Sequence, residues 1–92
     1  SEIYEFLYLK VILVPNTKNA LFWFYLQPTQ SSTRDNYLYN YSLLSNIPNP
    51  MVEKASILNA LMSNNLIENK AEHFHITDKG KRFLKYLGYS IN

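Results

Sequence analysis

The first part of the chain carries apolar residues at helical spacing. The segment Glu2–Val14 fits one helix face, although the apolar run at its end would also suit a buried strand. We favour the helix, because Pro15 ends it and a new helix start follows directly. The second helix is capped by Asn16 or Thr17 and continues to Leu26. It is apolar on every side, which predicts a central position in the core or contact with a second subunit.

The middle of the chain alternates between breakers and periodic segments. Residues 27–33 are polar and interrupted by proline, which indicates a loop. Apolar spacing then predicts a helix to about residue 45, followed by a tight turn rich in asparagine and proline. Asn49 is placed to cap a helix over residues 50–64, with a proline at its first position. Asn65 suits the left-handed conformation that often follows a helix.

The pattern changes to strands near the end of the chain. Residues 66–68 predict a short strand, residues 69–72 a hairpin connection, and residues 73–77 a returning strand with strict alternation. Its two apolar residues, Phe74 and Ile76, should face inward. Thr77 is placed to cap a last helix. The sequence therefore predicts a mainly α protein with a small β-hairpin, in the order α-α-α-α-β-β-α.

Composition and charge narrow the range of functions. Ninety-two residues are expected to form one domain, and the absence of cysteine excludes disulfides and thiolate metal sites. A chain this short buries little surface alone, which favours dimerisation. Five basic residues follow Asn69 against two acidic ones, so the C-terminal part is positive; such a part either faces phosphate or is a solvated helix face. No signal or membrane-spanning segment is apparent, and we expect a cytoplasmic, nucleoid-associated protein.

Two stretches resemble winged-helix regulators. Residues 57–68 are similar to the end of a recognition helix and its exit into a wing strand. Residues 75–84 resemble the junction between wing and last helix in the MarR and PadR families, where a hydrophobic residue, Thr, two polar residues and Gly recur. Asn65 departs from the glycine usual in those families. The resemblance covers residues 34–88, and single winged helices of this size also occur among archaeal plasmid and viral proteins, including partition proteins.

This resemblance implies a winged helix-turn-helix over residues 34–88. The first half of the chain resembles no family, and its apolar residues 1–27 are predicted to be a dimerisation segment. Together with the expected dimer, the resemblance implies a homodimer that binds double-stranded DNA, as a site-specific transcription regulator or a plasmid or viral partition factor. Tyr86, Leu87, Tyr89 and Ile91 of the last segment would assist the dimer contact. The alternative is a winged helix that binds another protein within a transcription or chromatin assembly. A protein of the same regulatory or partition system is a further candidate partner.

In this interpretation the helix over residues 50–64 enters the major groove, where amide, carboxylate and ammonium groups can pair with base edges. The expected base-reading residues are Asn49, Met51, Glu53, Lys54, Ser56 and Asn59. The wing, residues 69–73, would contact the backbone or the minor groove through Lys70 and His73. Backbone contacts are expected from Arg34, Tyr37, Asn40, Lys79 and Lys81.

Other chemistry finds little support in the sequence. His73 and His75 would share a strand face, but no third ligand is evident, so we expect no metal. The aromatic run over residues 22–25 is expected to form core or dimer contacts and not to stack on bases. Two glycines, no cysteine and no Ser-His-acid spacing give no basis for an enzyme or a cofactor site.

Overall fold

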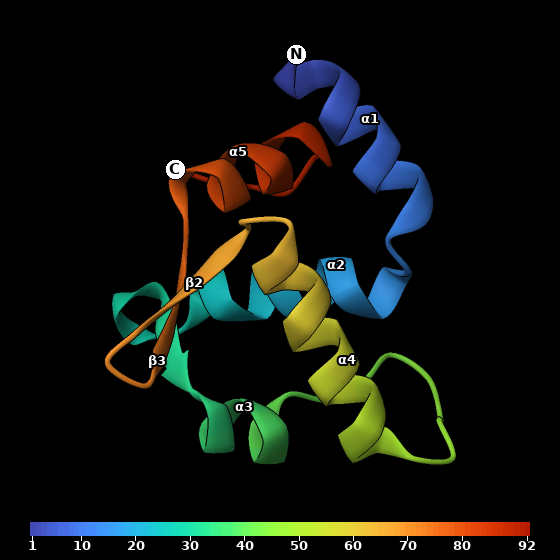
Figure 1. The fold of residues 1–92 in the computed structure, drawn as a ribbon, viewed down its shortest axis with the longest axis vertical. Coiled ribbons are helices and arrows are strands. Elements are labelled where there is room, and N and C mark those ends of the chain that lie inside the picture. Colours follow the sequence, from blue (N-terminus) through green and yellow to red (C-terminus); the bar gives the residue numbers. More distant parts are fainter.

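A computed structural model describes residues 1–92 as a mainly helical fold with a three-stranded antiparallel sheet (Figure 1). The helices are α1 (Glu2–Ile12), α2 (Pro15–Leu26), α3 (Arg34–Asn40), α4 (Pro50–Ser63) and α5 (Asp78–Tyr86), and the strands are β1 (Ser31–Thr33), β2 (Ile67–Lys70) and β3 (His73–Ile76). The predicted helical class with a β-hairpin is confirmed. None of these helices combines the length and apolar content needed to cross a lipid bilayer.

The core is built around α2. Ala20, Leu21 and Phe24 of this helix are completely buried, and α2 packs against α4, α5 and the sheet. Figure 1 shows α4 crossing in front of α2. Most of the apolar surface of α2 is therefore covered within one chain, and Leu26 at its end is exposed. In the structure α2 belongs to the same core as α4, α5 and the sheet, and the dimerisation role predicted for residues 1–27 stays a prediction.

The sheet places β3 between β1 and β2. Ile67 pairs with Ile76 in the β2–β3 hairpin, and Phe74 and Ile76 are buried, as the alternation predicted. The prediction of a loop over residues 27–33 was wrong at its end, because Ser31–Thr33 form β1 and pair with β3. The three residues of β1 are all polar, so they show no alternation of apolar and polar positions that would predict a strand. The strand forms because the free edge of β3 is available for pairing.

The third helix is shorter than predicted. It ends at Asn40 and not near residue 45, because Tyr41 adopts an extended conformation. The Tyr41 hydroxyl donates to the Asn16 carbonyl at 2.8 Å, and the Asn16 side chain accepts from the Leu44 amide at 2.6 Å. These bonds to α2 replace the ones that a longer helix would have made.

The junction between β3 and α5 is held by Thr77. The Thr77 hydroxyl accepts from the Gly80 amide at 2.9 Å and donates to the Asn65 carbonyl at 2.7 Å. Asn65 has φ of 58°, the left-handed conformation predicted for it. A Cβ at Gly80 would lie 2.2 Å from the Leu66 carbonyl oxygen, so this position accommodates only glycine. The Thr-x-x-Gly pattern thus has a local structural cause.

Candidate nucleic-acid interface

One face of α4 is open to solvent along its whole length. Val52, Ser56, Asn59 and Ser63 are exposed and recur at the spacing of a single helix face. The opposite face carries Ile57, Leu58 and Leu61, which are buried in the core. The exposed side chains are all short, so the helix backbone can approach another surface closely.

The β2–β3 hairpin forms a wing beside the start of α3. The turn consists of Ala71 and Glu72, which have φ of 51° and 67°. Pairing of Thr33 with His73 brings the wing next to the first turn of α3. Arg34 and Glu72 both line a small hollow there of about 240 Å³. The wing tip, α3 and the start of α4 lie at the same end of the molecule, and α5 lies at the other (Figure 1).

Most of the predicted contact residues are accessible on this end. Lys70 forms a solvent-exposed ion pair with Glu68 at 3.2 Å. Asn40 donates to the Asn36 side chain at 2.7 Å, and the Asn49 side chain caps α4. The exposed members of the predicted set are Arg34, Asn40, Asn49, Met51, Ser56, Asn59, Lys70 and His73.

Two predicted contact residues instead connect α3 to α4. Tyr37 is completely buried, so its assignment as a backbone contact was wrong. Its hydroxyl donates to the Lys54 carbonyl at 2.8 Å, and burial raises its pKa well above the ordinary value. The Lys54 ammonium donates to the Leu38 carbonyl at 2.7 Å, near the end of α3. Glu53, also predicted to read bases, is half-buried beside Val14 and Leu44.

Two of the five basic residues of the C-terminal part bind carboxylates of α1. The Lys79 ammonium contacts the Glu5 carboxylate at 2.5 Å and the Asn64 carbonyl at 3.1 Å, and is mostly buried. Arg82 binds both carboxylate oxygens of Glu2, at 2.7 and 3.0 Å, and this bond lowers the pKa of Glu2. Lys81 lies on the same helix, away from α3. Lys79 and Lys81 are therefore not part of the candidate interface.

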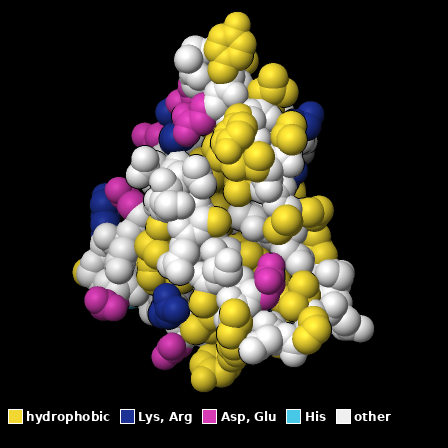
Figure 2. Space-filling view, turned by 45° about the vertical axis from the view of Figure 1, so that its right-hand side comes forward, with side chains coloured by type: hydrophobic (Ala, Val, Ile, Leu, Met, Phe, Trp, Pro, Cys, Tyr) yellow, Lys and Arg dark blue, Asp and Glu magenta, His cyan; other side chains and the backbone are white.

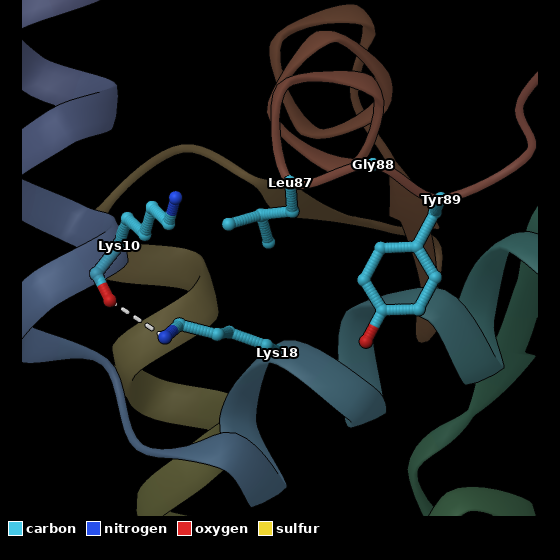
Figure 3. Close-up of a pocket in the computed structure, with 5 residues that line it drawn as sticks. All are labelled: Lys10, Lys18, Leu87, Gly88 and Tyr89. Carbon is cyan, nitrogen blue, oxygen red and sulfur yellow. Dashed lines mark hydrogen bonds between the residues drawn. The ribbon is translucent and has the colours of Figure 1, made fainter.

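The histidine pair and the clefts offer no stronger site. The ring centroids of His73 and His75 are 6.4 Å apart, and no group of three or more His, Cys, Asp or Glu is placed to hold a metal ion. An open cleft of about 340 Å³ lies between α1, α2 and the C-terminal segment, lined by Lys10, Lys18, Leu87, Gly88 and Tyr89 (Figure 3). The Lys18 ammonium donates to the Lys10 carbonyl at 2.6 Å, so one of its two cations is already engaged.

Comparison with models of known families, with curated proteins and with solved structures finds no match to this chain. One residue of the candidate interface was missed from the sequence, namely Glu72 beside Arg34. Its position at the centre of the predicted hairpin connection was the available signal.

Proposed function

We propose that this chain binds double-stranded DNA, with α4 in the major groove and the wing on the backbone or in the minor groove. The observation that carries the proposal is the exposed stripe of short side chains on α4 next to the β2–β3 hairpin. A helix of this diameter fits the major groove, and a neighbouring two-stranded wing reaches the flanking backbone. Site-specific regulation of transcription, or plasmid or viral DNA partition, is the role we propose for such a protein.

Polar groups on the stripe can provide base recognition. Asn59 can donate and accept at adenine, and Ser56 can pair with several bases. Arg34 at the start of α3 and Lys70 on the wing provide positive charge for phosphates on either side of α4. The acidic residues Asp35 and Glu72 lie close to Arg34, so we expect few phosphate contacts and a shallow dependence of the affinity on salt.

A salt titration tests the proposal. Fluorescence anisotropy of a labelled mixed-sequence duplex should show affinity falling with salt, with a log-log slope of about −2 per subunit for two neutralised phosphates. Arg34→Ala should reduce the slope by about one. Lys85→Ala removes the same charge from the exposed face of α5 and should leave the slope unchanged. Absence of binding at low salt would refute the proposal.

A charge placed on α4 tests the docking element itself. Ser56→Glu puts a carboxylate on the exposed stripe, where it would face phosphates, and should weaken binding at least about tenfold. Ser90→Glu adds the same charge on the exposed C-terminal segment and should have little effect. Equal affinity of the two variants would exclude α4 from the interface.

A second candidate function is binding of another protein through the same end. It is favoured by the exposed apolar side chains Leu44, Met51 and Val52, which adjoin the half-buried Glu53. Apolar residues with few charges are typical of the centre of protein interfaces. In that case Val52→Ala would weaken partner binding, and duplex DNA would not bind even at low salt.

A further inference from the structure

The helix α1 has two apolar faces, of which the fold uses one. Phe6 and Leu9 are buried, and the Phe6 ring lies 5.1 Å from that of Phe83 on α5. The opposite side, which we term the outer face of α1, consists of Ile3, Tyr4, Leu7, Tyr8 and Val11, with exposed fractions of 51 to 76%. A helix that is apolar all round is normally covered on all sides.

The charges of α1 point away from the outer face. Glu2 and Glu5 bind Arg82 and Lys79 of α5, and the Lys10 ammonium lies 6.0 Å from the Tyr86 ring centroid. Figure 2 shows hydrophobic side chains gathered over α1 at the upper part of this side of the molecule. The outer face therefore presents an uncharged surface whose only polar groups are tyrosine hydroxyls.

The outer face is a continuous row of large apolar side chains. All five of its residues are more than half exposed. Soluble monomers rarely expose a contiguous apolar patch of more than about 300–600 Å², whereas a partner in a specific interface contributes about 800 Å². A row of five such side chains is therefore the kind of surface that a second subunit covers.

We infer that the outer face of α1 binds the same face of a second copy of this chain. Tyr4, Leu7 and Val11 follow the alternating three- and four-residue spacing of a seam between two helices, so the occupant is itself a helix. An uncharged face is self-complementary under two-fold symmetry, because no like charges meet. A membrane surface fits less well, because helices that lie on anionic lipid carry basic residues on the flanks, and α1 has a single lysine.

A matched pair of leucine variants tests this contact. Sedimentation equilibrium of the intact chain at micromolar concentration should give a dimer. Leu7→Glu places a charge in the seam and should raise the dissociation constant by at least about a hundredfold. Leu26→Glu makes the same change at an exposed leucine at the end of α2 and should leave association unchanged. Circular dichroism confirms that both variants are folded.

Cross-linking supplies an independent measurement. The chain contains no cysteine, so Leu7→Cys introduces one thiol per subunit, and mild oxidation should yield a covalent dimer. Leu26→Cys should yield none at the same concentration. A monomeric wild type, an associating Leu7→Glu variant, or flotation of a monomer with anionic vesicles would each overturn the inference. None of these measurements involves DNA, so their outcome is separate from that of the proposed function.

Discussion

Tyr37 fixes the position of α4 relative to α3. Its ring stacks on Tyr41 and Phe24, with centroids 5.5 and 5.2 Å away, and its hydroxyl donates to the Lys54 carbonyl. The Lys54 ammonium returns a bond to the Leu38 carbonyl. Tyr37 thus binds the backbone of α4, and Lys54 binds the backbone of α3. Together these two bonds fix the angle between α3 and α4.

Replacing Tyr37 by Phe should lower the free energy of unfolding by about 1–2 kcal/mol, because the ring contacts remain while the Lys54 carbonyl loses its donor. Tyr39→Phe, on the exposed side of the same helix, should change it little. Urea unfolding of both variants at neutral pH measures the difference. Equal stability would mean that water replaces the hydroxyl.

The same tyrosine predicts sensitivity to alkali. Burial raises the pKa of Tyr37 in the folded protein, whereas the unfolded phenol titrates near its ordinary value of 10.0. Above that pH the unfolded chain binds fewer protons than the folded one, so stability falls as pH rises. Tyr37→Phe should therefore lose less stability than wild type between neutral pH and pH values above 10.0. Tyr41, whose pKa burial also raises, accounts for the part that remains.

At the scale of single elements, local rules predicted the second half of the chain well. The helix over residues 50–64 and the returning strand were found within a residue or two, because their caps and periods are set by neighbours in sequence. The Asn65 conformation and the Thr77 cap followed for the same reason. Accessibility of Ser56 and Asn59 also followed from the helical period.

The errors occurred where distant residues decide the structure. The end of α3 depends on Asn16, which lies 28 residues before the Leu44 amide it binds. The strand β1 depends on pairing with β3, more than 40 residues later in the chain. The burial of Tyr37 depends on how α3 crosses α4. No local pattern contains this information, and it explains both the misassignment of Tyr37 and the bond of the Lys54 ammonium to the Leu38 carbonyl.

The turn of the wing places two residues other than glycine in the left-handed backbone conformation. Two successive residues with positive φ between paired strands form a turn that favours asparagine followed by glycine. Ala71 and Glu72 occupy these positions, and each side chain is disfavoured in the left-handed region by roughly 1 kcal/mol. The wing is therefore less stable than its strand pairing alone would allow.

The double variant Ala71→Asn, Glu72→Gly should raise the free energy of unfolding by about 1–2 kcal/mol, because both residues tolerate positive φ. Thermal unfolding and hydrogen exchange of the β2–β3 amides measure the effect. Glu72→Gln removes the charge but keeps the side chain, and should not stabilise. If Glu72→Gln stabilised the protein as much as the double variant, repulsion between acidic groups, and not backbone strain, would be the cause.

At the scale of the whole molecule, α1 is held on one side only. Its contacts to α5 combine the Phe6 ring, which lies 5.1 Å from Phe83 and 5.7 Å from Tyr86, with the ion pairs Glu2–Arg82 and Glu5–Lys79. The Glu2–Arg82 pair is exposed and contributes little, so the buried side chains Phe6 and Leu9 should account for most of the attachment. The first and last helices thus close the molecule at the end away from α3 (Figure 1).

This arrangement predicts that α1 can open without unfolding the rest of the chain. Phe6→Ala should lower the free energy needed to detach α1 from the rest of the chain by about 3 kcal/mol. The α1 amides should then exchange roughly a hundredfold faster, while those of α2 and α4 change far less. Ile3→Ala shortens an apolar side chain on the outer face, which α5 does not cover, and should leave α1 exchange unchanged. Exchange of the Phe6→Ala and Ile3→Ala variants is best measured with the additional change Leu7→Glu, so that a second copy of the chain does not slow exchange of the α1 amides. Uniform acceleration across all helices in Phe6→Ala would show instead that α1 and the body unfold as one unit.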